Sequence, residues 1–174
     1  MKYNGVSFID SSPMYENAEQ IIGTLTGIPY FSDSFFYATK VWTTGKNEGI
    51  RQMDSPFKKM QRTIMDSMQI HNLADWKTHL KTLKDWKQEG KIKYMGITHY
   101  TDSMHTELER IIKKEQIDFV QFNYSISARN AEKSLLKTAA DNGVATIINR
   151  PFSEGHLLKN KRQLTSRLGS RIFY

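Results

Sequence analysis

The stretch THLKTLKDWKQEGKIKYMGITHY, residues 78–100, decides the fold class because it joins a helical pattern to a strand pattern. In its first part, Leu80, Leu83 and Trp86 share one face of a helix, while lysines and acids occupy the other. The apolar run YMGIT follows and ends in polar residues. The stretch therefore predicts a helix that leads into a buried strand.

Runs of this strand type recur six times, with centres 25 to 31 residues apart: VSFID, FFYATKV, SMQIH, YMGIT, FVQFN and VATIIN. Helical patterns lie between them, including residues 103–115 and 129–143, where Gly143 is placed to stop the helix. Alternating helices and near-continuous apolar strands predict an α/β protein with parallel strands and right-handed crossovers.

Two architectures built from parallel strands are consistent with this pattern: a doubly wound sheet and a (β/α)8 barrel. A doubly wound sheet usually carries a glycine-rich phosphate loop, and neither G-x-G-x-x-G nor G-x-x-x-x-G-K-[ST] occurs in the sequence. The even repeat favours a (β/α)8 TIM-barrel type fold. Only about six parallel βα units are visible, so the predicted barrel is incomplete.

The composition of the 174 residues, with 39% hydrophobic and 11% aromatic side chains, predicts one globular domain. No apolar run approaches the roughly 18 residues of a membrane span, and the first residues lack the layout of a signal peptide. We therefore expect a cytoplasmic protein with no membrane partner. The absence of cysteine excludes disulfides, thiolate catalysis and Cys-ligated zinc.

The formal charge of +7 is concentrated near the end of the sequence. Residues 159–174 carry five basic side chains and no acid, which leaves +2 for residues 1–158. This distribution predicts a barrel domain at 1–158 followed by a flexible basic tail at 159–174. A nucleic-acid-binding role for the tail is the less favoured alternative, because a short solvated tail is the simpler explanation of the charge.

Polar residues end every predicted strand, at the edge where the active site of a barrel lies. They are Asp10, Lys40, His71, Thr98 with His99, Gln121 with Asn123, and Asn149 with Arg150. A lone histidine is more often structural than catalytic, so the prediction does not rest on His71 alone. It rests on the recurrence of polar residues at the same place in each strand-helix repeat. This recurrence predicts a functional site at the mouth of the barrel.

The segment FIDSSPMYENAE, residues 8–19, connects the first of these residues to a tyrosine. Asp10 and Lys40 end adjacent strands and should pair, and Tyr15 should reach the lysine. A nearby positive charge would lower the tyrosine pKa from its usual value near 10 and favour proton donation. With His71 polarising a carbonyl oxygen, the four residues predict a proton-relay site for carbonyl reduction.

The motifs FIDSSPMY, YATKVW, MQIHN, GITHY and VQFNYS, in this order, resemble the strand-end signatures of the aldo-keto reductases over roughly residues 6–158. The resemblance implies a (β/α)8 barrel and reversible, NADPH-dependent reduction of an aldehyde or ketone. It implies a small-molecule carbonyl substrate. The family's four catalytic positions fall on Asp10, Tyr15, Lys40 and His71, with Tyr15 as the proton donor.

The same resemblance implies which residues bind the cofactor. The family's carboxamide-binding positions correspond to Thr98, His99 and Gln121, where Thr98 and His99 replace the common Ser-Asn pair. Asn149 and Arg150 complete the expected cofactor-binding set, and Arg150 is a partial substitute for the family's basic segment after the eighth strand. No metal site is expected, because Asp10, His71 and His99 form no short-range ligand pair.

Several features depart from the family pattern. The first and eighth βα units have no counterpart, and the resemblance ends after residue 161. Missing phosphate contacts, at about 1.5–3 kcal/mol per charge-assisted hydrogen bond, should weaken NADPH binding. Two exposed sheet edges should favour self-association. The alternative to a working reductase is therefore a truncated, non-catalytic barrel fragment with impaired cofactor binding.

Substitutions within the retained region raise further expectations. Glu16 replaces a family glycine and should strain the backbone, and Ser67 takes a buried strand position where an apolar residue is expected. Pro56 either interrupts a helix, at a cost of about 3 kcal/mol, or begins one with Asp54 or Ser55 as its N-cap.

At the barrel mouth, Trp42, Trp76 and Tyr100 either line an apolar pocket or serve ordinary packing.

Overall fold

The computed structural model describes residue 5, residues 7–27 and residues 35–159. Its strands are β1 Phe8–Asp10, β2 Phe36–Val41, β3 Met65–Ile70, β4 Ile92–His99, β5 Phe119–Asn123 and β6 Ala145–Asn149. They form one sheet in sequential order, and each strand is parallel to the next. A doubly wound sheet reverses its strand order at a switch point, and no reversal occurs among these strands. The predicted incomplete (β/α)8 architecture is confirmed.

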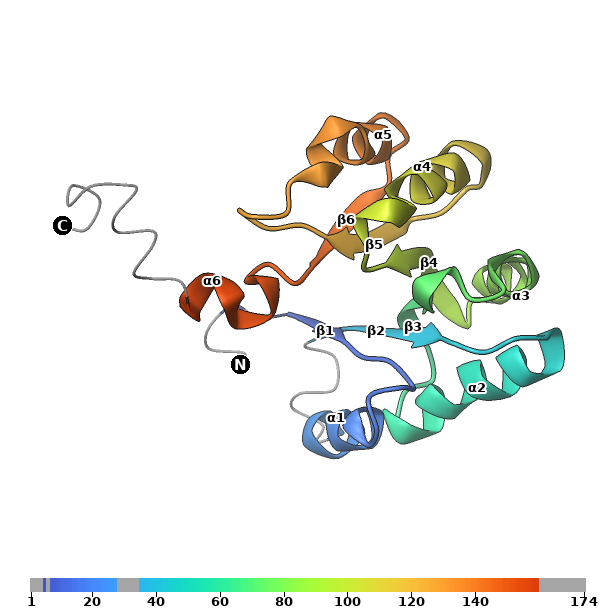
Figure 1. The fold of residues 1–174 in the computed structure, drawn as a ribbon. Coiled ribbons are helices and arrows are strands. Elements are labelled where there is room, and N and C mark those ends of the chain that lie inside the picture. Colours follow the sequence, from blue (N-terminus) through green and yellow to red (C-terminus); the bar gives the residue numbers. More distant parts are fainter. Residues whose placement is uncertain (1–4, 6, 28–34, 160–174) are drawn as a thin grey trace.

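The connecting helices lie on the outer, convex side of the curved sheet, where α1 to α5 follow one another around it (Figure 1). The helices are α1 Ala18–Thr26, α2 Lys46–Lys59, α3 Trp76–Gln88, α4 His105–Lys114, α5 Leu135–Asp141 and α6 His156–Lys159. Short 3-10 turns are η2 His71–Leu73, η3 Asp102–Met104, η4 Asn130–Lys133 and η5 Ser153–Gly155. Among the described residues, no helix has the length and apolar character needed to cross a membrane.

The core lies between the sheet and these helices. The predicted face of α3 is buried, with Leu80, Leu83 and Trp86 at most 5% exposed. The single helix expected over residues 129–143 is instead divided at Ser134, where φ is −159° and the side chain donates a hydrogen bond to Glu109. The expected tail, apart from Lys159 at the end of α6, lies outside the described residues.

Four aromatic rings near the amino-terminal ends of the strands pack against one another. Phe36 stacks on Phe8 at a centroid distance of 5.1 Å, and Tyr94 and Phe119 lie within 5.9 Å of it. Phe8 and Tyr94 remain more than one third exposed. In the described sheet, β1 and β6 are the edge strands, and self-association through them stays a prediction.

Pro56 lies inside α2, ten residues after the helix begins at Lys46. The reading in which it starts a helix is therefore wrong. The helix continues through the proline because Gly49, Met53 and Pro56 form one buried stripe at helical spacing. Packing of this face against the core offsets the backbone hydrogen bond that proline cannot make.

Ser67 is fully buried in β3, and its hydroxyl has no hydrogen-bond partner within the described residues. An unsatisfied buried hydroxyl costs free energy, so Ser67→Ala should raise the free energy of unfolding by about 1 kcal/mol. Ser12 is equally buried but bonds to a histidine nitrogen at 3.0 Å, so Ser12→Ala should lower stability by a similar amount. Urea denaturation of both variants measures the two effects, and a destabilised Ser67→Ala protein would contradict the argument.

Glu16 adopts a φ of 48°, the left-handed conformation that favours glycine. The strain expected from the sequence is therefore present. Glu16→Gly should be more stable than Glu16→Ala by about 1 kcal/mol, because both variants remove the charge and only glycine relieves the Cβ clash. Thermal or urea unfolding of the two proteins tests this, and equal stabilities would show that the backbone carries no strain there.

Candidate active site

The ammonium group of Lys40 is the most buried charge at the carboxyl edge of the sheet. Its side chain is 1% exposed, and Nζ lies 2.6 Å from Asp10 Oδ2 and donates to the carbonyl oxygen of Ser11 at 2.8 Å. The pairing follows from the fold, because β1 and β2 are adjacent parallel strands whose ends meet. Burial lowers the pKa of Lys40, and the Asp10 carboxylate opposes this shift.

The Asp10 carboxylate also receives two amide hydrogen bonds. Gln121 Nε2 donates to its Oδ2 at 3.0 Å, and Gln69 Nε2 approaches its Oδ1 at 3.4 Å. The Oε1 atoms of both glutamines are buried without a partner in the described part of the chain. Sequence reasoning missed Gln69, although it lies two residues before His71 in the predicted strand SMQIH, where alternate residues share one side.

Tyr15 and His71 complete the predicted group of four. The Tyr15 ring lies edge-on to the His71 ring at a centroid distance of 6.2 Å, and Lys40 Nζ lies 5.7 Å from the tyrosine ring centroid. Trp42 contacts the same histidine, with ring centroids 6.2 Å apart. The fold thus brings the residues from β1, β2, η2 and the β1–α1 loop into one cluster.

The expectation that Lys40 lowers the pKa of Tyr15 is wrong. Partial burial of the phenol raises its pKa, and the negative charge of Asp10 raises it further. The lysine does not reverse this because its ammonium already bonds to Asp10 and to the Ser11 carbonyl. Tyr15 is therefore a protonated phenol at neutral pH.

His71 is neutral at pH 7. Burial and the nearby Lys40 charge lower its pKa to about 4. Its Nδ1 lies 3.0 Å from the hydroxyl oxygen of Ser12, which is 1% exposed. Sequence reasoning missed Ser12, although it lies in the loop that was expected to reach the site.

The expected cofactor residues lie farther along the same edge of the sheet. Thr98 is buried at the end of β4, and the His99 ring stacks on Tyr100 with centroids 5.4 Å apart. Burial and the nearby His105 lower the pKa of His99. Asn149 ends β6, and its carbonyl oxygen accepts a hydrogen bond from the Tyr124 amide at 3.2 Å.

Arg150 follows β6 in a left-handed conformation with φ of 54°. Its guanidinium lies over the Tyr100 ring at 4.5 Å and pairs with Glu154 at 3.0 Å. These residues line a pocket of about 200 Å³ together with Asn123, Tyr124, Ala128 and Ser153. Tyr100 therefore lines a pocket, and Trp42 contacts His71, whereas Trp76 packs against the core.

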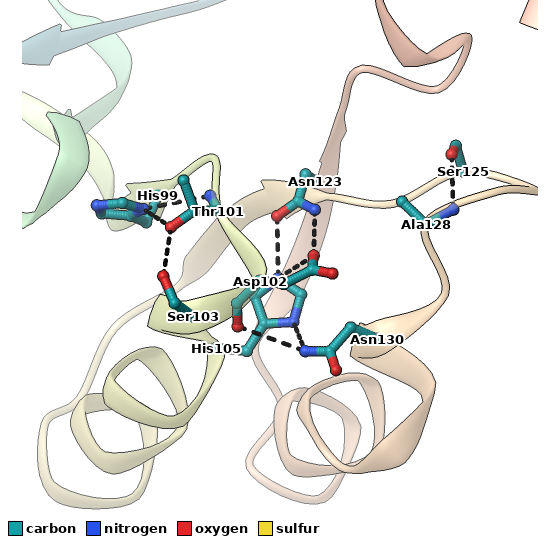
Figure 2. Close-up of polar contacts among 9 residues, drawn as sticks. All are labelled: His99, Thr101, Asp102, Ser103, His105, Asn123, Ser125, Ala128 and Asn130. Atoms are coloured by element: carbon teal, nitrogen blue, oxygen red, sulfur yellow. Dashed lines mark hydrogen bonds and ion pairs between the residues drawn. The ribbon is translucent and has the colours of Figure 1, made fainter.

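A hydrogen-bonded cluster supports the loops around this pocket (Figure 2). His105 is 3% exposed, with Nε2 3.0 Å from Asn123 Oδ1 and Nδ1 3.0 Å from Asn130 Nδ2. Asn123 also donates to the Asp102 carboxylate. The cluster joins the end of β5 to the starts of α4 and η4, so the structure gives the strand-end Asn123 an anchoring position.

Comparisons with known proteins point to one protein family. The model of the Aldo/keto reductase family matches residues 3–169, which extends beyond the residue at which the sequence resemblance was expected to end. Among curated relatives, "Aldo-keto reductase YhdN" of Bacillus subtilis is 22% identical over 168 residues, covering 88% of this chain and 50% of the relative. The "NADH-specific methylglyoxal reductase" of Escherichia coli is 26% identical, covering 88% of this chain and 54% of the relative.

Solved structures show the same fold. An aldo/keto reductase from Klebsiella pneumoniae in complex with NADP and acetate superposes with a TM-score of 0.78 at 19% identity, covering 98% of this chain and 63% of that chain. The chain spans about half the length of the curated relatives it matches. Because the family model covers nearly all of its sequence, the chain belongs to the aldo/keto reductase family.

Proposed function

We propose that this chain carries the site for NADPH-dependent reduction of an aldehyde or ketone to an alcohol, with Tyr15 as the proton donor. One observation carries the proposal. The buried Lys40–Asp10 pair lies beside a phenol and a neutral imidazole, with Tyr15 and His71 rings 6.2 Å apart. A charged pair is costly to bury, and its position beside two proton-handling groups supports a chemical role.

The proton transfer follows from the state of these groups. The raised pKa of Tyr15 keeps its proton in place until the carbonyl oxygen becomes strongly basic. The chemistry that bound NADPH would supply here is hydride donation to the carbonyl carbon. Tyr15 then donates its proton to the oxygen, and Lys40, 5.7 Å from the ring centroid, stabilises the phenolate that is left. Neutral His71 orients the carbonyl oxygen without adding a positive charge.

The residues present fit the nicotinamide end of such a cofactor. The buried Oε1 atoms of Gln121 and Gln69 have no partner among the described residues, and a carboxamide offers the N–H donors that they lack. We assign this end to Thr98, His99 and Gln121, and the opposite end to Asn149 and Arg150. Arg150 is already paired with Glu154, so phosphate binding there would replace one ion pair with another.

The substrate class is supported by relatives. One curated relative from Bacillus subtilis is named "Glyoxal reductase", at 23% identity and covering 91% of this chain and 58% of the relative. The Escherichia coli relative is named for methylglyoxal and for NADH. Both names describe reduction of small dicarbonyl compounds, so glyoxal and methylglyoxal are suitable test substrates, and NADH should be assayed beside NADPH.

A measurement of cofactor binding distinguishes two hypotheses: that the chain is a working reductase, and that it is a non-catalytic fragment. Titration with NADPH should quench the tryptophan fluorescence saturably, because Trp42 contacts His71 in the proposed site. Trp42→Phe should remove most of this signal while Trp86, buried in the core, continues to fluoresce. No saturable quenching at millimolar NADPH or NADH would reject the proposed function and favour the fragment.

Tyr15→Phe should lower kcat for methylglyoxal by at least about 100-fold, because general acid catalysis commonly contributes 10²–10⁴ in rate. The Kd for NADPH should stay within about twofold, since the substitution removes only a hydroxyl. Tyr94→Phe is the matched control, because Tyr94 lies in the aromatic cluster at the other end of the sheet. Full activity of the Tyr15→Phe protein would show that another group donates the proton.

A further inference from the structure

The contact between Ser12 and His71 links a buried loop to the imidazole of the proposed site. Ser12 Oγ lies 3.0 Å from His71 Nδ1, and Ser12 is 1% exposed. Within the described residues, this is the one hydrogen bond that the His71 side chain makes. Ser12 is therefore the hydrogen-bond partner of Nδ1. Nε2 has no partner within the described residues, so it can bond to a substrate.

The direction of this hydrogen bond follows from the groups around the serine. A hydroxyl has one hydrogen to donate and two lone pairs to accept with. The backbone N–H of Met14 points at Ser12 Oγ from 3.5 Å and occupies one of these lone pairs. Within the described residues, His71 Nδ1 is the one acceptor that bonds to the Ser12 hydroxyl. A serine that instead accepted from Nδ1–H would leave its own buried hydrogen without an acceptor, at a cost in free energy. The serine hydrogen is therefore directed at His71 Nδ1, which accepts it. A neutral imidazole that accepts at Nδ1 carries its hydrogen on Nε2.

We propose that Ser12 is a positioning residue that holds the proton of His71 on Nε2, so that the imidazole presents an N–H donor to the carbonyl oxygen of the substrate. The tautomer follows from the contacts of this chain alone, and its catalytic consequence rests on the proposed function. The rings of Tyr15 and Trp42 both pack near His71, each at a centroid distance of 6.2 Å. The low pKa of His71 keeps the ring neutral, so the tautomer sets its donor direction.

Loss of the serine hydroxyl would remove this control. In Ser12→Ala, Nδ1 has no donor facing it, so the proton can move from Nε2 to Nδ1. Nε2 would then present a lone pair to the carbonyl oxygen, and two lone pairs repel each other. Ser12→Thr keeps the hydroxyl and should keep the tautomer.

The tautomer is measured by two-bond ¹H–¹⁵N correlation spectra of the uniformly labelled protein at pH 7, without cofactor. The His71 signals are assigned by their loss in His71→Asn. We expect the pattern of an Nε2–H imidazole in the wild type and in Ser12→Thr, and a partial or complete change to Nδ1–H in Ser12→Ala. Ser67→Ala, which removes a buried hydroxyl elsewhere in the sheet, should leave the pattern unchanged.

Two results would overturn the proposal: an Nδ1–H tautomer in the wild type, or an unchanged Nε2–H tautomer in folded Ser12→Ala. Circular dichroism checks that this variant folds. If it does not fold, the wild-type and Ser12→Thr spectra decide: Nε2–H in both supports the proposal, and Nδ1–H in either rejects it.

The kinetic measurement is separate from the spectroscopic one. Ser12→Ala should lower kcat for methylglyoxal by about tenfold or more, with the Kd for NADPH unchanged and the rate restored in Ser12→Thr. Equal kcat in Ser12→Ala and the wild type would overturn the positioning role. Absence of turnover in the wild type would instead reject the proposed function, and the NMR result would still decide the tautomer.

Discussion

The buried ammonium group of Lys40 is the constraint on which the site depends. A lysine side chain that is 1% exposed keeps its charge only if partners replace the lost water. Asp10 and the Ser11 carbonyl are those partners, and both come from the end of β1 and the residue that follows it. The end of β1 must therefore lie against β2, and the loop that carries Tyr15 must start from this point.

Burial and the same ion pair together set the protonation of the neighbouring side chains. Burial and then Asp10 raise the pKa of Tyr15, whereas burial and then Lys40 lower the pKa of His71. A phenol that keeps its proton and an imidazole that stays neutral are the states that a carbonyl-reducing site needs at neutral pH. Partial burial is the largest cause of both shifts, so the proposed chemistry depends on the packing around the site as well as on its charges.

Asp10 also connects the site to the rest of the sheet. Its carboxylate takes hydrogen bonds from residues of β2, β3 and β5, including Gln69 and Gln121. Strands far apart in the sequence therefore meet at one group. A second network around His105 anchors the loops near Arg150. Contacts between strand residues therefore hold the group around Asp10 in place. Contacts between loops hold the residues near Arg150 in place.

The sequence by itself determined the strand-helix repeat, the family resemblance and the pairing of Asp10 with Lys40. These follow from local periodicity and from the rule that parallel strands end at one edge. Strain at Glu16 was also predictable, because a side chain replaces a glycine. Only the tertiary structure decided the pKa of Tyr15, the contact of Ser12 with His71 and the hydrogen bond from the Gln69 side chain to Asp10. Each depends on burial and on distances between segments remote in sequence, which no local pattern encodes. The course of α2 through Pro56 was likewise decided by packing, since a buried face outweighed the local preference of proline.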